Sequence, residues 1–144
     1  MSGKKFDVLV MSGDLNAKSE RLRIYVSGPM SGYEDANETA FRLGAEWVRY
    51  VLGAEAIVPH DLVVADHAGP CPAGRLGAST KAASGLHLEA CYLRNDYTAL
   101  LSADGIVMLP GWRASWGAKH ELTLAADIGL RIWFWTSDGP KEAL

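Results

Sequence analysis

Two acidic side chains fall on the apolar faces of predicted helices. Glu121 lies between two alanines at i−3 and i+4 spacing in a helix predicted over about 117–128. Asp96 lies between two leucines at the same spacings in a second predicted helix, about 86–101. An ionised carboxylate that is withdrawn from water without a partner destabilises the fold. Two inward acids therefore indicate either paired structural groups or a site that uses them chemically.

Each acid has a structural alternative. Asp96 could pair locally with Arg94 or Arg113, and Glu121 could accept from free backbone N–H groups in the first turn of its helix. For a single inward acid this structural interpretation is favoured. Two such acids beside a rim of hydroxyl groups favour a functional site.

Strands and helices alternate along the chain, which predicts an α/β fold with a three-layer, Rossmann-like parallel sheet of about five strands. The chain of 144 residues suits a single domain with its core at about 23–136. Segment 66–85, rich in Gly, Ala, Pro and Ser, is predicted to be a lid-like loop. The predicted strands are 23–27, 56–58, 106–109 and 131–135, with a possible edge strand over 6–11, and a helix opened by an Asp35–Glu38 capping box runs to about residue 53.

Ligands of parallel sheets bind beyond the carboxyl ends of the strands, and small or hydroxyl-bearing residues follow two of the predicted strands. Backbone N–H groups and hydroxyls of this kind bind phosphate, and Ser115 is also placed to cap the next helix. The same residues also form ordinary turns. A lone His60 is more often structural, and Trp112 suits base stacking and loop packing equally. The candidate binding residues are Ser27, Gly28, Pro29, Met30, Ser31, Gly32, His60, Gly111, Trp112, Ser115 and Gly117.

Composition excludes several functional classes. Hydrophobic residues make up 49% and charged residues 22%, with a net charge of −3 and no basic run, so a nucleic-acid polymer is not an expected partner. No apolar stretch is long enough to span a membrane and the N-terminus lacks a signal-peptide pattern, so we expect a cytoplasmic protein. Cys71 and Cys91 are interpreted as reduced thiols, and no spacing of metal ligands or GxGxxG turn predicts a metal or cofactor.

Four segments together resemble the nucleoside 2-deoxyribosyltransferase superfamily, which includes the 2'-deoxynucleoside 5'-monophosphate N-hydrolases. They are IYVSGPMSG from residue 24, RNDY from 94, ADGIVMLPGW from 103 and SWGAKHELTLAADIGL from 115. The resemblance covers about 24–133 and implies a flavodoxin-like fold. It further implies that Glu121 attacks the anomeric carbon of a sugar, that Asp96 holds the sugar and assists proton transfer to the base, and that Tyr25 orients Glu121 by hydrogen bonding.

One position separates the branches of that superfamily. Six residues before the nucleophile, the transferases carry an acid that meets the sugar 5'-hydroxyl, whereas the monophosphate hydrolases carry a serine that meets the 5'-phosphate. This chain has Ser115 there, and a hydroxyl suits a phosphate dianion better than a carboxylate does. The resemblance thus implies a small-molecule nucleotide substrate whose N-glycosidic bond is cleaved, within a homodimer. The alternatives are a transferase that moves deoxyribose between bases and a non-catalytic nucleotide-binding protein.

Overall fold

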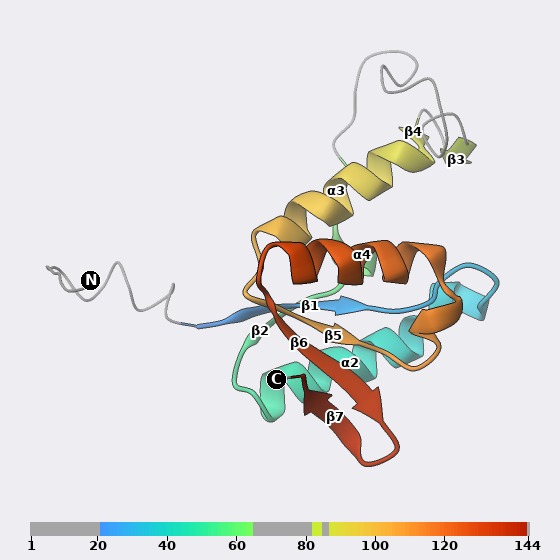
Figure 1. Cartoon of the computed structure of the whole chain (residues 1–144). Helices are drawn as coiled ribbons and strands as arrows, with labels where there is room; N and C mark the ends of the chain where they lie inside the picture. Colours follow the sequence, from blue (N-terminus) through green and yellow to red (C-terminus); the bar gives the residue numbers. More distant parts are fainter. Residues whose placement is uncertain (1–20, 65–81, 85–86, 144) are drawn as a thin grey trace, which may run out of the picture.

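The computed structural model describes residues 21–64, 82–84 and 87–143 (Figure 1). Its main sheet has five strands in the order β2-β1-β5-β6-β7. The edge strand predicted over 6–11 lies outside the described residues. The strands are β1 (Arg23–Ser27), β2 (Glu55–Ile57), β5 (Gly105–Met108), β6 (Arg131–Thr136) and β7 (Gly139–Glu142).

The predicted three-layer, flavodoxin-like α/β fold is confirmed, although the sheet is mixed rather than wholly parallel. The four predicted strands pair in parallel, each within one residue of its predicted bounds. A fifth strand, β7, pairs antiparallel with β6 through a turn between Thr136 and Gly139, so the sheet extends beyond the predicted core limit at residue 136. The sequence GPKE of β7 carries no apolar alternation, and it pairs because the hairpin turn returns it to β6.

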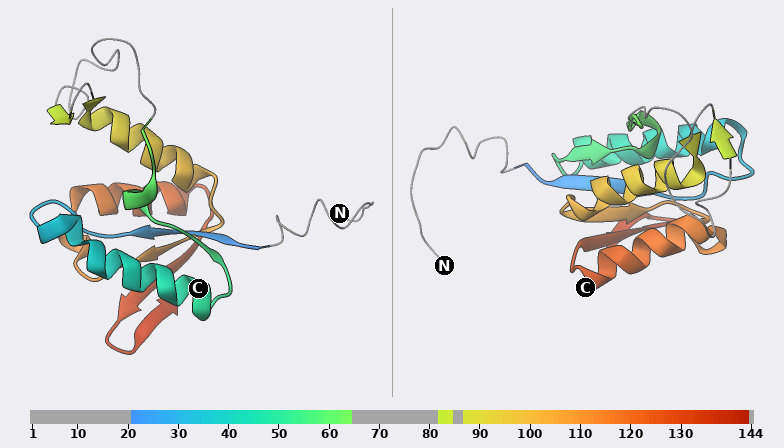
Figure 2. Two further views of the ribbon diagram at one scale, coloured as in Figure 1. Left: turned by 180° about the vertical axis from the view of Figure 1, so that it is seen from behind. Right: turned by 90° about the horizontal axis from the view of Figure 1, so that it is seen from above.

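Helices cover both faces of this sheet. Helix α2 (Glu38–Tyr50) packs on one face, and α3 (Glu89–Leu101) and α4 (Trp116–Asp127) pack on the other (Figures 1 and 2). Because side chains alternate along a strand, Ile24 and Val26 of β1 join the core cluster under α2, whereas Tyr25 joins the cluster under α3 and α4. Strand β1 therefore contributes side chains to both cores.

The predicted capping box at the start of α2 is wrong. The helix begins at Glu38, and Asp35 lies in a preceding short helical turn, η2 (Glu34–Asn37). Asp35, Ala36 and Asn37 have φ values of 52°, 52° and 62°, a left-handed conformation that cannot continue into an α-helix. The Asn37 amide donates to the Pro29 carbonyl at 3.0 Å rather than capping α2.

The segment predicted as one loop over 66–85 contains a short strand. β3 (Ala82–Ser84) pairs antiparallel with β4 (His87–Leu88), and α3 consequently begins at Glu89 instead of residue 86. Three small residues have no strand-like pattern, so this pairing was not predictable from local sequence. The rest of that segment lies outside the described residues.

Candidate functional site

Glu121 is the centre of a buried polar cluster between β1 and α4. Its side chain is only 8% exposed, and each carboxylate oxygen accepts one hydrogen bond from β1. The Tyr25 hydroxyl donates to Oε2 at 2.7 Å, and the Ser27 hydroxyl donates to Oε1 at 2.6 Å. The prediction that Glu121 points inward is confirmed, as is its hydrogen bond from Tyr25.

The local sequence explains this geometry. Tyr25 and Ser27 are two residues apart on a strand, so both side chains leave the same face of the sheet. Ala118 and Ala125, which are 1% and 0% exposed, lie on the same side of α4 as Glu121. These small side chains allow α4 to approach the sheet closely enough for a glutamate in the second helical turn to reach both hydroxyls.

Burial and hydrogen bonding act in opposite directions on Glu121. Burial raises the pKa of its carboxyl group because it disfavours the charged form, whereas the hydrogen bonds from Ser27 and Tyr25 lower that pKa. Burial also raises the pKa of Tyr25, followed by the negative charge of Glu121. Tyr25 therefore remains protonated and keeps its role as a donor to the carboxylate.

Asp96 lies half-buried on α3, where burial and then the charge of Glu121 raise its pKa to about 7. Neither predicted arginine partner neutralises it: Arg113 lies over the ring of Trp112 at 4.7 Å, and no ion pair or hydrogen bond joins Asp96 to another described residue. At neutral pH this carboxyl group is divided between its protonated and ionised forms. It can therefore donate or accept a proton under the same conditions.

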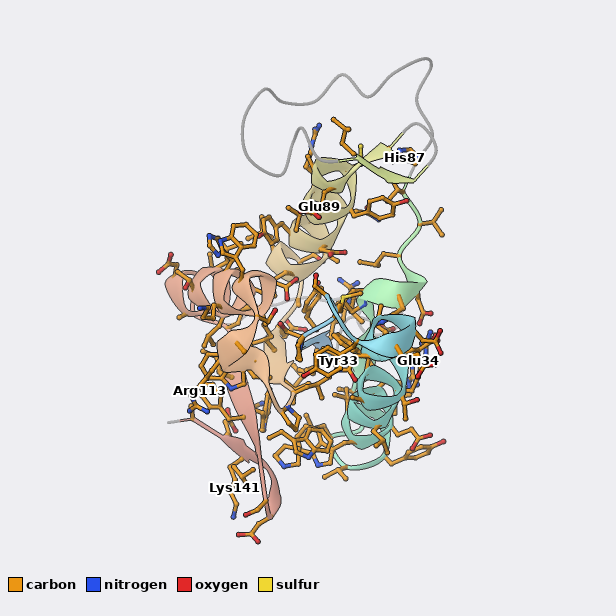
Figure 3. All side chains as sticks on the ribbon, turned by 90° about the vertical axis from the view of Figure 1, so that its right-hand side faces the viewer. Tyr33, Glu34, His87, Glu89, Arg113 and Lys141 are labelled. Atoms are coloured by element: carbon orange, nitrogen blue, oxygen red, sulfur yellow. The ribbon has the colours of Figure 1, made fainter. Side chains whose placement is uncertain are left out.

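The loops after β1 and β5 meet at one edge of the site. The backbone N–H of Leu109 donates to the Ser27 carbonyl at 2.8 Å, and β1 and β5 are neighbours whose chains continue to opposite sides of the sheet. Their carboxyl ends therefore form the topological switch point, where ligands of such sheets bind. Figure 3 views the molecule from this side, with Tyr33 of the first loop between Glu34 and Arg113.

Two glycines in the loops after β1 and β5 have packing roles that the sequence did not indicate. A Cβ at Gly28 would lie 2.9 Å from the Leu109 Cβ, so Gly28 permits the two loops to pack and does not merely open space for a ligand. Gly111 has φ +88°, and a Cβ there would lie 3.2 Å from the Pro29 ring. Gly117, by contrast, has open space at its Cβ position.

Of the other predicted binding residues in these loops, some are exposed and others have structural contacts. Ser31 and Gly32 are exposed, and Met30 packs against the core under α2. Ser115 caps α4 as predicted, because its hydroxyl accepts from the Ala118 N–H at 3.1 Å. This leaves the N–H groups of Trp116 and Gly117 in the first turn of a helix whose amino end favours anions.

His60 and Trp112 make contacts within the protein. One ring nitrogen of His60, Nε2, bonds to the Ala36 carbonyl at 2.9 Å, and its ring meets Phe41 edge-on at 4.6 Å. Trp112 packs on Phe134 with ring centroids 5.5 Å apart. Both residues therefore have structural contacts: His60 supports η2, and Trp112 packs its loop against β6.

Sequence reasoning missed two hydroxyl groups of the cluster. Ser27 was expected to donate to a phosphate, whereas its hydroxyl proton is directed to Glu121. Tyr97, in the helix predicted over about 86–101, was not singled out as a site residue, yet its hydroxyl is buried and makes no hydrogen bond with any described residue. The i, i+2 spacing of Tyr25 and Ser27 opposite an inward acid was a usable signal for the first, and none was available for the second.

Two features of other classes of site are absent from the described part of the chain. No three His, Cys, Asp or Glu side chains there gather as a metal site would require, and no helix there combines the length and apolarity needed to cross a membrane. A surface hollow along the outer side of α2, lined by residues that include Glu38 and Arg42, lies on the opposite face of the sheet from Glu121.

Comparison with protein families gives one match, over residues 22–134, to a domain of unknown function, DUF4406. The chain belongs to the DUF4406 family. The matched segment of this DUF4406 domain contains Tyr25, Ser27, Asp96 and Glu121, and it ends within β6. No curated protein and no solved structure matches the chain.

Proposed function

We propose that this DUF4406 domain cleaves the N-glycosidic bond of nucleoside 5'-monophosphates, with ribose or 2'-deoxyribose as the sugar, and releases the free base. The observation that carries the proposal is the buried carboxylate of Glu121, whose two oxygens are each held by a hydroxyl donor at the switch point of the sheet. A purely structural acid could equally have used the solvent-facing positions of α4, where Lys119, Thr123 and Asp127 are exposed.

In the proposed reaction, Glu121 is the nucleophile. One carboxylate oxygen forms a bond to the anomeric carbon as the bond from that carbon to the base nitrogen breaks, through an oxocarbenium-like transition state. Water then cleaves the glycosyl ester, which regenerates the carboxylate and gives the sugar phosphate. Tyr25 and Ser27 restrict the rotation of Glu121, so the carboxylate is oriented before the ligand arrives.

Asp96 supplies the proton that the departing base needs. Its pKa of about 7 keeps a substantial protonated fraction at neutral pH, and its acidity increases when the charge on Glu121 disappears in the covalent intermediate. The ionised Asp96 then accepts a proton from the attacking water. One half-buried carboxyl group thus serves both half-reactions.

The 5'-phosphate is assigned to the amino end of α4. Ser115 begins the helix there, and the first-turn N–H groups and the helix dipole favour a dianion over a neutral 5'-hydroxyl. This assignment distinguishes a monophosphate substrate from a free nucleoside.

A substitution of Glu121 tests the proposal. Glu121→Gln keeps the shape of the side chain but removes its nucleophilic charge, so base release from a panel of ribo- and 2'-deoxyribonucleoside 5'-monophosphates should fall on the order of 10³-fold or more. Base is measured by chromatography, with and without an added acceptor base, and intact-protein mass spectrometry after acid quenching should detect a glycosyl adduct only with Glu121 present. The matched control is Asp127→Asn, an exposed acid of the same helix.

Three results would count against this assignment. Unchanged turnover in Glu121→Gln would eliminate the nucleophile. Base exchange that occurs only with an acceptor base would show a transferase, and monophosphate binding without base release would show a non-catalytic binding protein.

A further inference from the structure

The hydroxyl group of Tyr97 is buried and makes no hydrogen bond with any described residue. A buried polar atom of this kind is unusual because water has been removed without a protein partner in exchange. A phenylalanine would fill almost the same space without burying a polar atom, so packing alone does not account for the hydroxyl. The unpaired hydroxyl therefore needs a different explanation.

Tyr97 is placed among the polar groups of the site. It follows Asp96 on α3, which packs with α4 on the face of the sheet that carries Tyr25. Burial raises the pKa of Tyr97, and the charges of Glu121 and then Asp96 raise it further. Burial and Glu121 are the main causes of the raised pKa of Tyr25, to which Tyr97 adds the smallest contribution. The Tyr97 hydroxyl is therefore close enough to interact electrostatically with all three groups.

Some of these polar groups have hydrogen-bond partners and others do not. Tyr25 and Ser27 have their donors directed to Glu121, whereas the donor of Tyr97 and the oxygens of Asp96 are unused within the described part of the chain. A free donor and a free acceptor on adjacent residues of one helix match a hydroxyl group, which can accept one hydrogen bond and donate another.

We propose that Tyr97 and Asp96 together bind a hydroxyl group of the ligand's sugar, with Tyr97 donating to it and Asp96 accepting from it. The inference takes its ligand from the proposed function. In a 2'-deoxynucleoside 5'-monophosphate, the 3'-hydroxyl is the only free hydroxyl on the sugar. Tyr97 is therefore assigned as a specificity-determining contact for that group.

The experiment compares Tyr97→Phe with its parent in two measurements. In the free protein, the urea midpoint of Tyr97→Phe should equal or exceed that of wild type, because the substitution removes a buried hydroxyl that has no partner. Binding is measured by calorimetry in a Glu121→Gln background, so that the ligand is not consumed. There, Tyr97→Phe should weaken binding of 2'-deoxynucleoside 5'-monophosphates about tenfold or more and leave the affinity for the 2',3'-dideoxy analogues unchanged.

Tyr50→Phe is the matched control, because Tyr50 is 84% exposed on α2. It should change neither measurement. Equal losses for deoxy and dideoxy ligands, unchanged affinity for both, or a clear loss of stability in Tyr97→Phe would each overturn the inference. Monophosphate binding that depends on Tyr97, in a protein that releases no base, would contradict the proposed reaction and leave this contact standing. Failure of the parent protein to bind any monophosphate would refute both the proposed reaction and the Tyr97 contact.

Discussion

At the scale of single residues, the chemistry of the site depends on how two hydroxyl donors offset the burial of one carboxylate. Glu121 would be hard to ionise in its buried position without them, since burial raises its pKa and the hydrogen bonds from Ser27 and Tyr25 lower it. An attacking carboxylate must be ionised. The two bonds therefore affect the reactivity of Glu121 as well as its orientation.

Removal of the shorter bond should change the pH dependence of the reaction. In Ser27→Ala, the pKa of Glu121 should rise, because a hydrogen bond to a charged group contributes about 1.5–3 kcal/mol. That range corresponds to about 1–2 pH units. The acid limb of kcat/KM should move upward by this amount, with activity partly recovered at higher pH.

The pH profile separates an electrostatic role of Ser27 from a simple loss of packing. A uniform fall in rate at every pH, with the acid limb in place, would show that Ser27 only supports the local structure. Ser137→Ala, an exposed serine beyond β6, should leave the profile unchanged.

The residue scale also shows what the sequence could predict. The i+3 and i+4 spacing was sufficient to place Glu121 and Asp96 on inward helix faces, because helical periodicity is local. The direction of a hydroxyl proton is not local. Ser27 donates to Glu121 because α4 brings that carboxylate opposite β1. The Tyr97 hydroxyl has no partner among the described residues because the tertiary packing brings none to it.

At the scale of elements, the site depends on the close packing of the loops after β1 and β5. Gly28 is buried against Leu109, and the Leu109 N–H donates to the Ser27 carbonyl. This contact fixes the end of β1, from which Ser27 reaches Glu121. The loops after β1 and β5 therefore pack into the core and also border the site.

Two alanine substitutions should have opposite effects on stability. Gly28→Ala places a methyl group 2.9 Å from the Leu109 Cβ, so it should lower the free energy of unfolding by about 1–3 kcal/mol. Gly117→Ala, in the first turn of α4 with open space around it, should raise that free energy by about 0.5–1 kcal/mol. Urea unfolding measures both, and equal midpoints for the two variants would refute the packing role of Gly28.

Elements with strong apolar patterns were predictable, and elements that depend on pairing were not. The strands around Tyr25 and Ile106 are central and buried, so their runs of apolar residues located them within one residue. By contrast, β7 and the left-handed turn at Asp35 form because of a hairpin and of contacts from Asn37 and His60. The contact from His60 to Ala36 joins positions 24 residues apart and leaves no local signal. The hairpin before β7 is local, and its Asp138-Gly139 pair was a turn signal that the strand prediction did not use.

At the scale of the whole molecule, carboxyl groups with raised and lowered pKa values make stability depend on pH in two separate ranges. The ion pair with Arg42 lowers the pKa of Asp61, so its contribution is present at neutral pH and is lost as the pH falls below about 4. Asp96 has the opposite behaviour. Its pKa of about 7 in the folded protein lies above the ordinary value of 3.8.

The folded state therefore binds the Asp96 proton more tightly than the unfolded state does. Stability should fall as the pH rises from about 4 to 7 and become level above that, with a slope of at most about 1.4 kcal/mol per pH unit from this one group. Asp96→Asn removes the ionisation but keeps the shape, so its free energy of unfolding relative to wild type should increase across the same interval. Urea unfolding at half-unit pH steps measures this difference, with Asp127→Asn as the exposed control. A difference that stays constant from pH 4 to 7 would mean that Asp96 ionises in the folded protein as readily as in water, and Asp96 would then be too acidic to protonate a departing base at neutral pH.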